Sequence, residues 1–170
     1  ISSAFLAILS IEALGDNTNI SNMEIFIEGK SVRLYYATDF QNMEFLTHDI
    51  TDPEIRINQL FPYLSERIKI DNLGKECSSS LVTSSYFPGV NLAYFIVDYK
   101  CDSKVENLTL RYDMFFEFFG THQAHTTFNI GDNYSRVIFR DTYRSHILTM
   151  PVSAIFGKSG VGGILTEYKY

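Results

Sequence analysis

Two histidines near the middle of the chain have the residue type and spacing of a metal site. His122 and His125 lie three residues apart, a separation at which two imidazoles can bind one metal ion from a helix or a tight turn. They follow a Gly-Thr pair at the end of a predicted strand, where hydrogen bonding in a surface loop is the alternative. We expect the loop, because His48 and His146 lie elsewhere in the sequence and no third ligand is evident.

Two cysteines offer a second kind of chemistry. Cys77 and Cys101 are the only cysteines, so one intramolecular pairing is open to them. Each stands at the end of a strand-like run beside polar residues, whereas buried inert thiols usually have apolar neighbours. We therefore predict a disulfide, worth roughly 3–4 kcal/mol in the chain-entropy model, and with it an oxidising, extracytoplasmic compartment, periplasmic or at the cell surface. Two buried free thiols in a cytosolic protein are the alternative.

A calcium site is not expected. Residues 47–59 are similar in length to an EF-hand loop, but Asp49, Asp52 and Glu54 have the wrong spacing. Gln59 stands where the loop requires a bidentate glutamate. A capped helix explains the acidic residues equally well.

Catalytic signals are weak elsewhere in the chain. The serine run at 78–80 lacks the G-x-S-x-G context of a hydrolase nucleophile, and a cysteine nucleophile would conflict with the disulfide. We predict that the protein is not an enzyme and holds no cofactor. A metal-dependent hydrolase that uses His122 and His125 is the alternative.

The composition is that of one acidic globular domain. The chain has 170 residues, of which 45% are hydrophobic, and a net charge of −6. Nucleic-acid binding needs a basic surface, so no nucleic-acid partner is expected. No window reaches ~18 apolar residues without charge, so no membrane-spanning helix is predicted. Aromatic residues make up 15% of the chain, which favours β-strands.

The elements that would position these residues are mostly strands. Residues 28–31 (EGKS) predict a hairpin turn in which glycine supplies a positive φ. The predicted strands are Phe5–Leu14, Met23–Glu28, Val32–Tyr36, Arg67–Ile70, Cys77–Phe87, Leu92–Cys101, Leu108–Phe119, Thr126–Ile130, Tyr134–Phe139 and Ser145–Met150. In the strand 108–119 one parity is apolar, and we expect its side chains to face one core: Leu110, Tyr112, Met114, Phe116 and Phe118.

One helix is predicted between residues 51 and 68. Thr51–Glu54 resembles a helix start, and apolar residues from Leu60 to Ile68 follow at helical spacing, although Pro62 allows a later start. Many strands with one helix and no βαβ alternation predict an all-β, antiparallel β-sandwich, Ig-like in general architecture, with one short inserted helix. We assign residues 1–153 to this domain and residues 154–170 to a Gly-rich C-terminal tail that would lie near a membrane.

Three stretches together resemble the extracytoplasmic N-terminal domain of HupE/UreJ-type bacterial membrane proteins. They are Thr47–Cys77, Leu108–Glu117 (LTLRYDMFFE) followed by His122, and Gly160–Tyr168 (GVGGILTEY). The family's acidic stretch is degraded here, and its histidine and aspartate before the first membrane helix fall on Gly163 and Lys169. Metal chemistry attributed to that motif therefore does not carry over.

The resemblance implies an exported β-rich domain that is tethered to a membrane in the full-length protein. In the family the membrane part is linked to nickel handling for hydrogenase or urease. We accordingly expect a non-catalytic binding or accessory domain, with its own or another membrane domain as partner. A stand-alone surface adhesion module is the other alternative besides the hydrolase.

Overall fold

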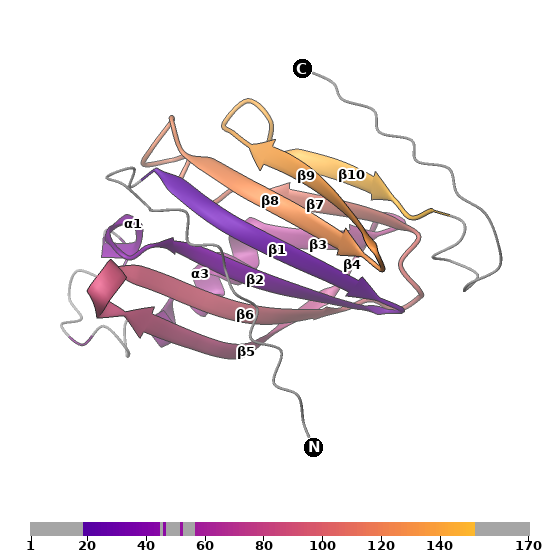
Figure 1. Cartoon of the computed structure of the whole chain (residues 1–170), viewed down its shortest axis with the longest axis horizontal. Helices are drawn as coiled ribbons and strands as arrows, with labels where there is room; N and C mark the ends of the chain where they lie inside the picture. The colour runs from indigo at the N-terminus through magenta and orange to yellow at the C-terminus, as the bar shows by residue number, and fades with distance from the viewer. Residues whose placement is uncertain (1–18, 45, 47–51, 53–56, 152–170) are drawn as a thin grey trace.

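The computed structural model describes residues 19–44, 46, 52 and 57–151. Within them, two β-sheets pack face to face and form an all-β sandwich (Figure 1). The predicted fold class is confirmed, although the strand counts of the sheets differ from those of constant-type immunoglobulin domains. The predicted strand 5–14 and the tail 154–170 lie outside the described residues.

Six strands form the larger sheet, in the order β5-β6-β2-β1-β8-β9. Gly29 turns the β1–β2 hairpin with a φ of +60°, a conformation that glycine adopts at no steric cost, and this hairpin is the predicted one. β1 also pairs in parallel with β8, the exception among otherwise antiparallel pairs. The strand bounds are β1 Ile20–Glu28, β2 Ser31–Asp39, β5 Ser78–Phe87, β6 Leu92–Lys100, β8 Gln123–Ile130 and β9 Asn133–Phe139.

Four shorter strands form the second sheet, which lies behind the larger one in Figure 1, in the order β10-β7-β3-β4. Residues along β3 alternate between buried and half-buried, as a strand with one face on a core requires. The bounds are β3 Ile68–Asn72, β4 Lys75–Glu76, β7 Asn107–Tyr112 and β10 Ser145–Thr149.

Short helical segments connect the strands. They include α1 Gln41–Glu44, α3 Phe61–Arg67 and the 3-10 turn η1 Pro88–Val90, and residues 57–59 are helical as well. The predicted helix is α3, in its later-starting form: Pro62 lies in its first turn, where a missing N–H leaves no bond unmade, and Leu64 is buried. Of the earlier start considered at residues 51–54, Asp52 is not helical and the other residues lie outside the described part.

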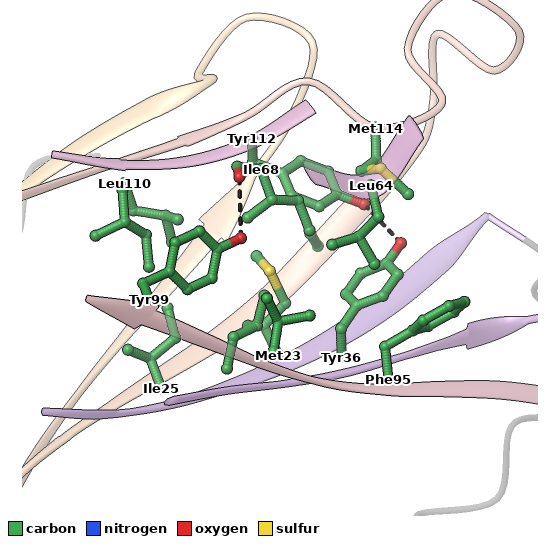
Figure 2. Packing of buried hydrophobic residues seen from close by; sticks show 14 of the residues in the cluster. Met23, Ile25, Tyr36, Leu64, Ile68, Phe95, Tyr99, Leu110, Tyr112 and Met114 are labelled. Atoms are coloured by element: carbon green, nitrogen blue, oxygen red, sulfur yellow. Dashed lines mark hydrogen bonds between the residues drawn. The ribbon is translucent and has the colours of Figure 1, made fainter. Parts of the chain in front are cut away.

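Apolar side chains from both sheets meet in one core (Figure 2). Met23 and Ile25 from β1 and Phe95 from β6 belong to the larger sheet, and Leu110 and Tyr112 from β7 belong to the smaller one. All five are essentially inaccessible to solvent. Burial of these faces supplies the main driving force for folding.

The prediction for residues 108–119 is wrong in its second half. β7 ends at Tyr112, and Phe115 adopts a φ of +65° and is fully buried. The backbone N–H groups of Phe118 and Phe119 both donate to the carbonyl of Phe115, so the chain turns instead of continuing as a strand. Met114 and Phe116 are buried as expected, but Phe118 is 46% exposed. Strand parity therefore applies only as far as Tyr112.

Candidate functional site

The predicted disulfide between Cys77 and Cys101 is present, with the two Cα atoms 4.3 Å apart. Both residues are almost fully buried. They flank the paired residues Ser78 and Lys100, so the bond closes the open end of the β5–β6 pair, opposite its η1 turn. Disulfides persist in oxidising surroundings, so the bond indicates an oxidising, extracytoplasmic environment.

His122 lies between the two sheets and not in the surface loop expected from the sequence. Its exposed fraction is 0%, and its backbone N–H donates to the carbonyl of Phe119 at 3.0 Å, which closes the turn before β8. The imidazole stacks on the Tyr112 ring, with centroids 6.0 Å apart and planes 11° apart. Phe115 and Phe116 present their rings at 5.1 and 6.0 Å.

The imidazole belongs to a buried hydrogen-bonded group that joins the two sheets, here named the hydroxyl cluster: Ser21, Tyr36, Thr38, Tyr112 and His122. The Nε2 atom of His122 lies 2.9 Å from the Tyr112 hydroxyl and 3.2 Å from the Ser21 hydroxyl. Ser21 donates to the Thr38 hydroxyl at 2.8 Å and lies 2.9 Å from the Tyr36 hydroxyl. The hydroxyls of Tyr36 and Tyr112 are 3.3 Å apart, and Figure 2 shows them meeting between the sheets.

Burial keeps the titratable members of the hydroxyl cluster uncharged at neutral pH. It lowers the pKa of His122 to about 4 and raises the pKa of Tyr36 to about 12. The pKa of Tyr112 is raised well above its ordinary value for the same reason. A neutral imidazole has one donor and one acceptor nitrogen, so the tautomer decides the direction of the cluster's hydrogen bonds.

The unpaired nitrogen of the imidazole indicates which tautomer is present. Nδ1 of His122 is buried and has no hydrogen-bond partner within the described residues. A buried N–H without an acceptor is rarer than an acceptor without a donor, so the proton belongs on Nε2. The hydrogen bonds then form a series that starts at Nε2–H and passes through the hydroxyls of Tyr112, Tyr36, Ser21 and Thr38. Each of the first three hydroxyls donates once and accepts once.

This arrangement stabilises the fold. Each hydroxyl of the cluster bonds with another member of the cluster. The side-chain amide of Asn42 in α1 also donates to the Thr38 hydroxyl, at 3.1 Å. The cluster bonds β1 and β2 of the larger sheet to β7 of the smaller one through uncharged partners. Such a network fixes the relative position of two sheets, because every unmade bond in the core would cost free energy.

His125 does not join His122. His125 is exposed on β8 between the buried Ala124 and Thr126, so it faces away from the core and away from His122. It borders a shallow surface hollow of about 350 Å³ with Asn19 and Thr121. Its pKa is lowered, first by partial burial and then by the charge of Arg140.

His146 has a hydrogen-bond partner of its own. His146 on β10 lies with Nδ1 2.8 Å from the Tyr143 hydroxyl, and His48 lies outside the described residues. In the described part of the chain, no three His, Cys, Asp or Glu residues converge as metal ligands would. The histidine pair suggested by the spacing of residues 122 and 125 is therefore divided between the core and the surface.

No protein-family model matches the chain, and no match was found among curated proteins. Among the helices that the structure describes, none is long and apolar enough to cross a membrane.

Sequence reasoning missed the hydroxyl cluster, although it placed Tyr112 on the core face with Leu110. Tyr36 shares strand parity with the buried Leu34, so it could have been placed on an inward face too. A tyrosine whose ring is buried usually finds a partner for its hydroxyl. That requirement was the available signal for a polar group inside the core.

Proposed function

We propose that the chain is a non-catalytic, extracytoplasmic binding or accessory domain of the kind that forms the soluble part of HupE/UreJ-type membrane proteins. The observation that carries this proposal is the position of His122. It is the histidine that the family's segment shares, and it holds the two sheets together from inside the core. The disulfide and the β-sandwich support the same assignment.

The geometry weighs against the hydrolase alternative. A metal-dependent hydrolase typically binds its ion through three protein ligands beside an open position for water. His122 is shielded from solvent and neutral, and His125 lies on the opposite face of the larger sheet. The two imidazoles are therefore not placed to bind one ion together.

Calorimetric titration with nickel and with zinc at pH 7 tests the non-catalytic assignment. We expect no stoichiometric binding of sub-micromolar affinity, and the same result for His125→Ala and for the control His146→Ala. Sub-micromolar binding that His125→Ala or His122→Gln abolishes, with the fold intact by circular dichroism, would overturn the proposal and revive the metal site.

The accessory role is tested in the full-length gene product. We expect the coding sequence after Tyr170 to contain membrane helices, and we expect protease added outside spheroplasts to digest the domain while a cytosolic marker survives. A domain that resists external protease together with the cytosolic marker would refute the extracytoplasmic placement.

A further inference from the structure

Four aromatic side chains form a row across the outer face of the larger sheet. Here named the aromatic row, it consists of Phe26 on β1, Tyr35 on β2, Tyr94 on β6 and Phe87 on β5. Successive ring centroids are 5.4 Å apart for Phe26 and Tyr35, 6.4 Å for Tyr35 and Tyr94, and 6.4 Å for Tyr94 and Phe87. The row crosses four neighbouring strands, so it spans about 15 Å at the usual strand spacing.

The row belongs to the solvent side of the sheet and not to the core. The residues before and after Tyr35, Leu34 and Tyr36, are fully buried, so alternation directs Tyr35 outward. Phe26 and Phe87 at the two ends are 41% and 47% exposed. This face of the sheet is turned toward the viewer in Figure 1. Tyr35 and Tyr94, between the two ends of the row, are half-buried. Aromatic residues in mutual contact on an outer face are more informative than scattered ones, because they form a continuous surface.

Polar and charged groups accompany the rings on the same face. Arg33 stands opposite Phe26 and forms two hydrogen bonds with Asp98, at 2.7 and 2.8 Å. Glu24 stands opposite Tyr35, and Ser85 stands opposite Tyr94. Three of the four rings, Phe26, Tyr35 and Tyr94, therefore have a hydrogen-bonding side chain as cross-strand neighbour.

This mixture of groups selects among the possible occupants. The centre of a protein–protein interface is depleted of charge, whereas Arg33, Asp98 and Glu24 lie beside the rings. An anionic lipid surface or a nucleic acid would require unpaired cations, and the cation here is already paired with Asp98 in a chain of net charge −6. A carbohydrate matches both features, because a sugar ring has a C–H face that packs on an aromatic ring and a rim of hydroxyls that donate and accept hydrogen bonds.

We propose that the aromatic row is a binding platform for uncharged oligosaccharides. Sugar rings pack on Tyr35 and Tyr94, and their hydroxyls bond with Glu24 and with the Arg33–Asp98 pair. The length of the row fits several consecutive sugar units rather than a monosaccharide. This inference rests on the proposed function, since it names the ligand class of an extracytoplasmic binding domain.

Titration with soluble oligosaccharides tests the platform. The probes are cellohexaose, N-acetylchitohexaose and mannohexaose, each followed by calorimetry and by chemical-shift changes of the tyrosine rings. We expect at least one probe to bind, and the double variant Tyr35→Ala/Tyr94→Ala to weaken its affinity at least ~10-fold. If the double variant does not fold, Phe26→Ala at the exposed end replaces it, with a smaller loss expected.

Tyr134→Ala is the matched control, because Tyr134 is an exposed tyrosine of the same sheet, 67% exposed on β9 and outside the row. Binding that survives in Tyr134→Ala and is lost in the row variants supports the proposal. Equal losses in both would overturn the placement of the site. Failure of all three probes would overturn the carbohydrate platform, as would a sedimenting dimer that Tyr35→Ala dissociates. Neither result touches the metal and protease tests of the accessory domain.

Discussion

Acid should destabilise this protein through His122. Its pKa is about 4 in the folded chain against an ordinary value of 6.5, because burial disfavours the charged imidazole. Between these two values the unfolded chain binds more protons than the folded chain. The contribution of His122 to the free energy of unfolding is therefore fully present above pH 6.5, and it is lost as the pH falls toward 4. A shift of this size corresponds to about 3 kcal/mol.

The assay is urea unfolding at pH 7.5, 6, 5 and 4, for the wild type and for His122→Gln. Carboxylates titrate in the same range, so the informative quantity is the difference between the two proteins in how much stability they lose. We expect the wild type to lose about 3 kcal/mol more than His122→Gln between pH 7.5 and pH 4. His125→Gln is the control: the pKa of His125 is also lowered, but its side chain lies at the surface, so this variant should depart from the wild type by much less than His122→Gln does. Parallel curves for the wild type and His122→Gln would refute the assignment of a neutral, buried imidazole.

Three further predictions concern the core and the covalent bond. Tyr112→Phe keeps the ring but removes the hydroxyl that bonds His122, and should cost about 1–3 kcal/mol in chemical denaturation; no measurable loss would contradict the hydroxyl cluster. Phe116→Ala should lower the free energy of unfolding by roughly 3–5 kcal/mol, whereas Phe118→Ala, at an exposed position, should lower it by under ~1 kcal/mol. Equal losses would instead support a strand that continues to Phe119. Thiol titration of the unfolded, unreduced protein should detect no free Cys77 or Cys101, and two free thiols would disprove the bond.

The strands were readable from the sequence because their signals are local. Alternation along residues 92–101 and the glycine turn at 28–31 each depend on neighbours in the chain, and both predictions are confirmed. The end of β7 was not readable, because Phe115 enters a left-handed conformation that a non-glycine residue rarely adopts. Tertiary packing of the aromatic residues around it overrides the alternating pattern.

The depth of His122 was hidden for a different reason. Its partners Ser21 and Tyr112 are 101 and 10 residues away in sequence, on strands of different sheets. Spacing within the segment 122–125 suggested a metal pair, but the strand that begins at Gln123 sends His125 to the opposite side. The disulfide was predictable because two cysteines leave a single pairing.

The covalent closure of the β5–β6 pair also has a mechanical consequence. In a chain pulled from its two ends, tension passes directly from Cys77 to Cys101 and bypasses the strands between them. The separation of 24 residues would otherwise lengthen the unfolded chain by roughly 80 Å. In a domain held between a membrane and an external ligand, part of the larger sheet would thus bear no tension. The chain would extend fully only after the disulfide is reduced.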